Sequence, residues 1–220
     1  MSRIKQFFER RKNDFEYKTV TAAVGSFAAT AFFALYNGFL GLHHRSLWHG
    51  TICVYYIVLV VLRGIIIVPR KSVSTMSDPE HAQTKIYVVS AALLLFLNIC
   101  LIIPVSIMVV RQRPVNITLI PAIAVAAYTT YKVIMAFINL KKKKQSSDSL
   151  VRMLRTISFI EALVAILTLQ NTLIMVNMKD DSTDMLMLMA FTSAAVMLAA
   201  VTMSVVALIK GIANLRGNRN

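Results

Sequence analysis

Acidic residues are scarce in this sequence. Its 220 residues include 10 Asp and Glu against 24 Lys and Arg, which gives a formal net charge of +14. Charged residues of both signs make up 15% of the chain, whereas a typical soluble domain has about 25%. The charges that occur are clustered between long apolar runs. This composition argues against a soluble globular protein.

Cysteine is scarce as well. The chain has two cysteines, Cys53 and Cys100, and each lies inside a hydrophobic run. Two separated cysteines within apolar segments make neither a disulfide framework nor a metal-binding pair. We therefore interpret both as small buried apolar residues.

Motifs for nucleotide and metal chemistry are missing. The sequence has no Walker A loop, no dinucleotide fingerprint and no HExxH. His43, His44 and His49 lie close in sequence, but adjacent histidines point apart on a helix and no acid or thiol completes a ligand set. Ser46 lies beside these histidines without a carboxylate to orient a catalytic base. We expect no metal, no cofactor and, on balance, no enzymatic activity.

The basic charge does not indicate nucleic acid. Lys and Arg lie mostly at the ends of the hydrophobic runs, which is the pattern of membrane topology. A nucleic-acid-binding face would need a basic helix with interleaved aromatic residues, and the sequence has none. The partner implied by these charges is a lipid bilayer.

Long hydrophobic runs are abundant, and 57% of the residues are hydrophobic. Several runs approach or exceed the ~20 residues that cross a bilayer core of about 30 Å. Because the backbone must satisfy its own hydrogen bonds in lipid, these runs are expected to be helices. We predict an all-α, polytopic membrane bundle with six transmembrane helices in one domain, residues 19–210. The six runs cover residues 19–42, 49–69, 86–110, 115–140, 156–178 and 185–210.

Charge also predicts the orientation of the bundle. Residues 1–18 form a basic segment, either an amphipathic helix on an anionic leaflet or a disordered tail, and residues 211–220 form a basic tail. The side of the bundle that holds both termini collects 18 Lys and Arg, and the opposite side collects four. The positive-inside rule therefore predicts a cell-membrane protein with both termini in the cytoplasm.

Short connections predict that neighbouring helices pair as antiparallel hairpins. Each odd-numbered run contains an amide, at Asn37, Asn98 and Asn171, and each even-numbered run ends in a basic signature. Two explanations stay open: three helical-hairpin repeats, or convergence of unrelated helix ends. Repeats matter because many transporters place their sites at repeat interfaces.

Three ionisable residues lie within the predicted spans: Arg63, Lys132 and Glu161. A charge at the bilayer centre costs about 2.5–3.5 kcal/mol on insertion scales, so such residues usually face a protein interior or an aqueous cavity. We expect all three in the cytoplasmic half of the bundle, with Glu161 paired to Arg63 or Lys132.

Polar residues at helical spacing extend these positions into stripes. His49, Tyr56 and Arg63 recur every seven residues, Tyr128 and Lys132 are four apart, and Glu161 shares a face with Thr168 and Thr172, flanked by Asn171. Inward-facing stripes would form a polar core. The predicted solute-binding residues are Arg63, Lys132, Glu161, Asn37, Asn98, Tyr56, Tyr128 and Asn171.

The polar core has two interpretations. It is either a static packing element, or a cavity open to the cytoplasm whose two bases and one acid suit a small anion or zwitterion. The leading hypothesis is a small transporter or permeation protein for a polar or anionic solute. The alternative is a non-transporting protein that binds a membrane partner, either another protein or a second copy of itself. A membrane-embedded enzyme comes third.

Three segments resemble a known group of proteins: YNGFLGLHHRSLWHGTICVYY, PAIAVAAYTTYK and LTLQNTLIMVN. They are similar to small multi-pass membrane proteins of clostridia and related Gram-positive bacteria, and the resemblance extends along the chain. That family has no assigned activity or site residues. The resemblance thus implies a bacterial plasma membrane and gives no information about the mechanism.

Overall fold

The computed structural model describes residues 15–68, 79–111, 119–141, 149–177 and 183–217, and these form six α-helices. The helices are α2 (Phe15–His43), α3 (Leu47–Ile67), α5 (Pro79–Arg111), α6 (Leu119–Lys141), α7 (Ser149–Asn177) and α8 (Thr183–Gly217). The predicted all-helical bundle is confirmed. The expectations for residues 1–14 and 218–220 lie outside the described residues.

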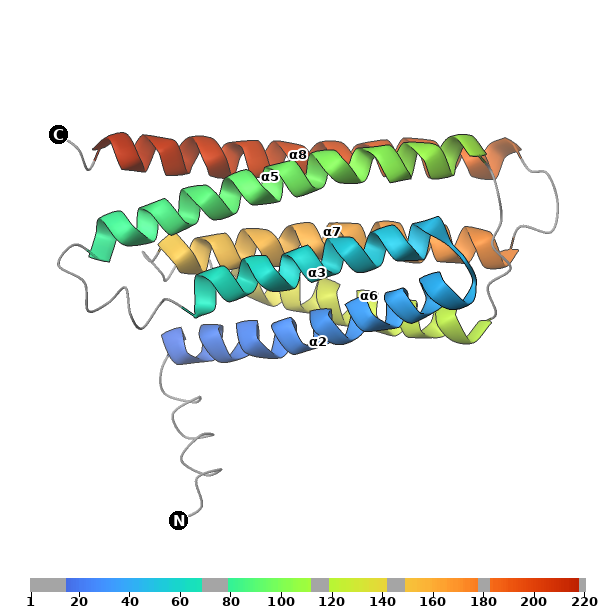
Figure 1. The fold of residues 1–220 in the computed structure, drawn as a ribbon, viewed down its shortest axis with the longest axis horizontal. Coiled ribbons are helices and arrows are strands. Elements are labelled where there is room, and N and C mark those ends of the chain that lie inside the picture. The colour runs from blue at the N-terminus through green and yellow to red at the C-terminus, as the bar shows by residue number, and fades with distance from the viewer. Residues whose placement is uncertain (1–14, 69–78, 112–118, 142–148, 178–182, 218–220) are drawn as a thin grey trace, which may run out of the picture.

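Three helices extend by seven residues at one end beyond the apolar runs that predicted them. α5 begins at Pro79 rather than at residue 86, α7 begins at Ser149 rather than at residue 156, and α8 ends at Gly217 rather than at residue 210. All three extensions lie at the end of the bundle where α2 begins and α8 ends, called here the terminal end (Figure 1). Polar residues continue a helix well beyond its apolar part, so hydropathy alone places these boundaries inside the helix.

Four helices are long and apolar enough to cross a membrane, within the segments Val24–His43, Leu47–Ile67, Glu80–Ile107 and Met187–Arg216. A shorter apolar stretch, Ala122–Ile138, lies in α6. α7 is surrounded by neighbouring helices, and most of its residues from Leu150 to Thr172 are buried or partly buried. A helix shielded in this way can carry polar residues that a lipid-facing helix cannot.

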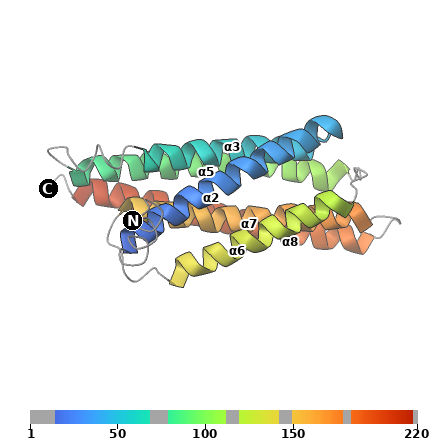
Figure 2. The ribbon, with the colours of Figure 1, turned by 90° about the horizontal axis from the view of Figure 1, so that it is seen from below.

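The helices form two layers of three. The first unit is α2, α3 and α5, and the second is α6, α7 and α8; in each unit the middle helix packs against both neighbours (Figures 1 and 2). α2 lies opposite α6, α3 opposite α7, and α5 opposite α8. Because the chain alternates direction, the facing helices in each pair run in opposite directions. The second unit therefore has the same topology as the first, but each of its helices runs in the opposite direction along the bundle axis.

Packing between the units is uneven. α5 and α8 pack extensively along their length, whereas α3 and α7 contact each other lightly. α6 packs mainly with α7, so the short connection before it does not make a tight hairpin with α5. The α5–α8 contact joins the units firmly on one side, and side-chain interactions bridge them on the other.

The tight hairpin between α2 and α3 is confirmed, and its residues explain it. Arg45 adopts φ 49°, and Ser46 caps α3 by accepting a hydrogen bond from the His49 backbone N–H at 3.5 Å. A Cβ on Gly41 would lie 2.9 Å from the Gly50 backbone nitrogen. Glycine at position 41 therefore permits the close approach of the two helices.

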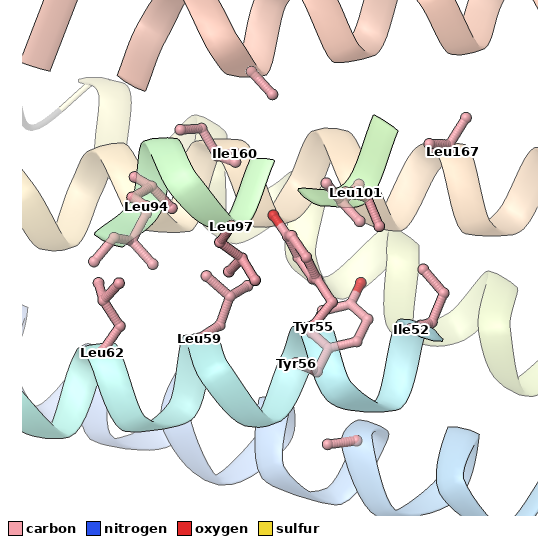
Figure 3. Packing of buried hydrophobic residues seen from close by; sticks show 14 of the residues in the cluster. Ile52, Tyr55, Tyr56, Leu59, Leu62, Leu94, Leu97, Leu101, Ile160 and Leu167 are labelled. Carbon is pink, nitrogen blue, oxygen red and sulfur yellow. The ribbon is translucent and has the colours of Figure 1, made fainter. Parts of the chain in front are cut away.

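The apolar core lies where α3, α5 and α7 meet (Figure 3). α3 contributes Ile52, Tyr55, Leu59 and Leu62 at helical spacing, and these side chains are at most 2% exposed. The outer surface is also apolar: Phe32 is 74% exposed, Leu42 84% and Phe191 76%. Exposed large apolar side chains around a partly polar interior are typical of a protein in a bilayer.

Candidate functional site

A buried ionic cluster links the two units. The Arg63 Nη2 atom on α3 lies 2.5 Å from Glu161 Oε2 on α7, and the Lys132 Nζ atom on α6 lies 2.6 Å from Glu161 Oε1. The exposed fractions of the three side chains are 1%, 2% and 0% for Arg63, Lys132 and Glu161. The structure thus brings together the three ionisable residues identified within the predicted spans, and Glu161 pairs with both bases rather than with one.

Two hydroxyl residues of α2 complete this triad. Ser26 Oγ accepts hydrogen bonds from Arg63 Nη1 and Lys132 Nζ, both at 2.9 Å. Thr30 Oγ1 accepts from the same two groups at 3.0 and 2.7 Å, and lies 2.5 Å from Glu161 Oε1. Each hydroxyl group therefore accepts hydrogen bonds from both cations. The site is formed by α2 together with α3, α6 and α7.

Two further side chains of the second unit bind the carboxylate and the guanidinium, one as a donor and one as an acceptor. The Tyr128 hydroxyl donates to Glu161 Oε1 at 2.8 Å, and Arg63 Nη2 donates to Ser158 Oγ at 3.2 Å. Glu161 Oε1 thus faces Thr30, Tyr128 and Lys132, whereas Oε2 faces Arg63. This distribution orients the carboxylate with one oxygen toward each base.

The charge of the triad does not balance. Two cations and one carboxylate leave a formal charge of +1 in a site that is almost completely buried. In a buried ion pair, the attraction between the opposite charges offsets part of the desolvation cost. The excess charge here has no opposite charge to provide that attraction. Hydroxyl groups and a backbone carbonyl, Ser26 O at 3.2 Å from Lys132 Nζ, provide the remaining solvation. The site is therefore chemically suited to one additional negative charge.

The triad lies near the middle of the bundle. Glu161 is the thirteenth of the 29 residues of α7, and Lys132 is the fourteenth of the 23 residues of α6. Arg63 is nearer the end of α3, and its long side chain reaches back to Glu161. The sequence predicts a position nearer the cytoplasm, because the apolar run of α7 begins later than the helix itself.

Aromatic side chains cover the triad on the side facing the α2–α3 hairpin. The Phe33 ring of α2 stacks on the Tyr128 ring of α6, with centroids 3.7 Å apart and an interplanar angle of 4°. Tyr56 of α3 contacts both rings edge-on, with centroid distances of 5.2 Å to Phe33 and 5.8 Å to Tyr128. Together these rings close the gap between the two units directly above the charges.

Beyond the aromatic rings, two predicted residues carry buried polar atoms. Asn37 donates from Nδ2 to the Phe33 carbonyl, so its Oδ1 faces His49 Nδ1 at 3.0 Å. Asn171 is fully buried, and neither amide atom has a hydrogen-bond partner within the described helices. The same holds for the Tyr56 hydroxyl and His49 Nε2. Unsatisfied buried polar groups are costly and rare, so this group requires an explanation beyond packing.

Asn98 belongs to a different network. Its Oδ1 accepts from the Tyr55 hydroxyl at 3.1 Å, and its Nδ2 donates to Ser204 Oγ at 2.9 Å. These bonds join α3, α5 and α8 on the firmly packed side of the bundle. Tyr55 bonds Asn98, whereas the neighbouring Tyr56 contacts the Phe33 and Tyr128 rings beside the triad, so Asn98 belongs to a network separate from that of Glu161.

The sequence does not single out Ser26, Thr30, Phe33 and Ser158 as site residues. A signal exists in part, since Ser26, Thr30 and Asn37 share a face of α2 and Ser158 precedes Glu161 by one turn. Serine and threonine are common in membrane helices, and only the tertiary arrangement shows which of them solvate the charges.

Two other features bear on the expected chemistry. Within the described ranges, no three His, Cys, Asp or Glu side chains come together as metal ligands. An apolar groove of about 270 Å³ lies between α7 and α8, on the hairpin side of the triad. Large aliphatic side chains and one amide line it: Ile166, Leu169, Gln170, Leu173, Ile174 and Leu188.

Comparisons with known proteins give no further guide to the site: no protein-family model, no curated protein and no solved structure matches this chain.

Proposed function

We propose that this chain is a membrane transport protein that carries a small monovalent anion, with Arg63, Lys132 and Glu161 as its binding site. The observation that carries the proposal is the location of an excess buried charge at the interface between two oppositely oriented three-helix units. Transporters built from inverted units bind their solutes near the bilayer midplane at such an interface. The triad lies at the corresponding interface between the two units here.

The sign and size of the charge define the solute class. The empty triad has a formal charge of +1, so one monovalent anion makes the site neutral. Neutrality matters because a net charge is costly to hold in the low-dielectric interior of a membrane protein. A divalent anion would leave the opposite excess. The site therefore favours a monovalent anion over sulfate.

The bonds of the triad suggest how the site opens. Lys132, Glu161 and Tyr128 are held together within the second unit. The bonds from Arg63 to Glu161, and from Lys132 to Ser26 and Thr30, cross between units. Separating α2 and α3 from α6 and α7 leaves Arg63 without its counter-ion and frees Lys132 donors, while the α5–α8 contact keeps the units joined. An anion entering from that side meets two cations.

The same proposal includes the membrane arrangement. All six helices cross the bilayer, with most of α7 shielded from lipid by its neighbours, and the terminal end faces the cytoplasm because it collects most of the Lys and Arg residues. The membrane is a bacterial plasma membrane, as the sequence resemblance implies. Asn37, Tyr56 and Asn171 lie toward the opposite face, where the unpaired atoms of Tyr56 and Asn171 provide polar contacts for water or solute.

Flux measurements test this function. The full chain is reconstituted in liposomes loaded with chloride, nitrate, formate or sulfate, and anion efflux is followed after valinomycin shunts the membrane potential with K⁺. We expect the monovalent anions to leave faster than sulfate. Lys132→Met, which removes a charged contact to the solute, should lower the rate about tenfold or more.

The matched control is Lys210→Met, which makes the same change at an exposed position on α8 and should leave the flux unchanged. Two results contradict transport by this site. One is a folded wild-type protein that moves none of the four anions above the rate of empty liposomes. The other is a folded Lys132→Met protein whose flux equals that of the wild type.

A further inference from the structure

Arg155 is the least satisfied polar side chain in the described part of the chain. It lies in the second turn of α7 and is 8% exposed. None of its three guanidinium nitrogen atoms has a hydrogen-bond partner within the described residues. Arg63, by contrast, donates to two hydroxyls of α2, to Ser158 and to Glu161. A buried arginine without an acceptor is costly, so its ligand is to be sought outside the bundle.

The side of α7 that carries Arg155 faces away from the ionic triad. Ile166 and Leu173 follow Arg155 by 11 and 18 residues, spacings that return to the same side of a helix. They are 40% and 44% exposed, and both line the apolar groove between α7 and α8. Arg155 therefore lies on the same side of α7 as an apolar surface that is exposed at Ile166 and Leu173.

The position of Arg155 along α7 corresponds to the start of the predicted membrane span. The apolar run of this helix begins at residue 156, immediately after Arg155, and the six preceding residues of the helix include the exposed Arg152. Residues at such a boundary lie at the level of lipid headgroups. The flexible stem of an arginine lets its head turn toward that layer while its methylene groups stay on the apolar flank.

We propose that Arg155 binds the phosphate of an anionic membrane lipid whose acyl chain lies along this flank of α7. A guanidinium offers paired donors that match two phosphate oxygens, and an adjacent apolar surface suits the lipid chain. The additional positive charge of Arg152, one turn nearer the membrane surface, attracts anionic rather than neutral lipids. This lipid site is separate from the triad and does not depend on anion transport.

Lipid binding is tested on the full chain in a mild detergent. Native mass spectrometry counts the lipids retained after addition of phosphatidylglycerol or phosphatidylcholine, and melting curves record stabilisation by the same lipids and by inorganic phosphate. We expect phosphatidylglycerol to be retained and to raise the melting temperature more than phosphatidylcholine does. Arg155→Gln should weaken retention of phosphatidylglycerol about tenfold or more.

Two variants keep this test decisive. Lys210→Gln removes a positive charge at an exposed position on α8, away from Arg155, and should leave lipid binding unchanged. Arg155→Lys keeps the charge without the planar fork and should bind lipid at an intermediate level, which provides a readout if Arg155→Gln does not fold. Equal retention by wild type and Arg155→Gln would overturn the proposal. So would equal stabilisation by inorganic phosphate at the same concentration, which would identify a soluble anion as the ligand.

Discussion

Arg63 and Glu161 form an ion pair at 2.5 Å between the middle helices of the two three-helix units. Each residue has a second set of contacts: Arg63 reaches Ser26 and Thr30 in its own unit, and Glu161 contacts Lys132 and Tyr128 in its own unit. The pair is therefore the central link between two polar groups that otherwise belong to separate units. It joins α3 to α7, two helices whose backbones otherwise contact each other only lightly.

Removing the acid should damage the fold more than removing one base. Glu161→Gln leaves two buried cations without a counter-charge and is expected to lower the free energy of unfolding by about 3–5 kcal/mol. Lys132→Met keeps the Arg63–Glu161 pair and leaves the cluster formally neutral, so its stability should be unchanged or higher. Unfolding by SDS in mixed micelles measures both effects.

A double variant checks the electrostatic origin of that loss. Adding Lys132→Met to Glu161→Gln removes one of the two uncompensated charges and should restore part of the lost stability. If the double variant is instead less stable than Glu161→Gln alone, shape and hydrogen bonding rather than excess charge govern this site.

The stack of Phe33 on Tyr128 should act as a barrier above the triad. Phe33→Ala removes one of its two rings and is expected to speed anion flux through the proteoliposomes severalfold, with a loss of about 3–5 kcal/mol in stability. The neighbouring Phe32→Ala makes the same change at a side chain that is 74% exposed, so both properties should stay near wild type. A folded Phe33→Ala protein with unchanged flux would show that the stack does not limit access.

The contact between Gly41 and Gly50 should be intolerant of a methyl group. A Cβ at position 41 would lie 2.9 Å from a backbone atom that cannot rotate away, so Gly41→Ala is expected to destabilise the α2–α3 hairpin by about 1–3 kcal/mol. At Gly64 an added methyl group would meet nothing within 4 Å, so Gly64→Ala should be neutral or stabilising through its higher helix propensity. Thermal melting of the two variants in detergent compares them directly.

Local physical chemistry accounts for what the sequence predicts well. Long apolar runs can only be helices in lipid, and the cost of burying Arg63, Lys132 and Glu161 makes their association predictable. The grouping of six helices into two units depends on contacts between distant segments, such as α5 with α8, which helical spacing does not encode. For the same reason Ser26 is not recognisable from sequence as a partner of Lys132, although it lies 2.9 Å away.

Substitutions at Asn98 and Asn171 distinguish a buried amide that stabilises the fold from one that contacts the solute. Asn98 makes two side-chain hydrogen bonds, so Asn98→Leu should lower the free energy of unfolding by about 1–2 kcal/mol and leave the flux of the folded protein unchanged. Asn171 is fully buried with both amide atoms unpaired in the described helices, so Asn171→Leu should keep or raise stability. If its amide contacts the permeating solute, the same change lowers flux.

The same change from asparagine to leucine is thus expected to have different effects at positions 98 and 171. SDS unfolding and anion efflux are measured on both variants, and the expected result is a stability loss at position 98 with a flux loss at position 171. A stability loss of similar size at both positions would mean that Asn171 is bonded in the folded protein. Unchanged flux in a stable Asn171→Leu protein would remove this residue from the solute path, and the path would then be confined to Asn37, Tyr56 and the triad.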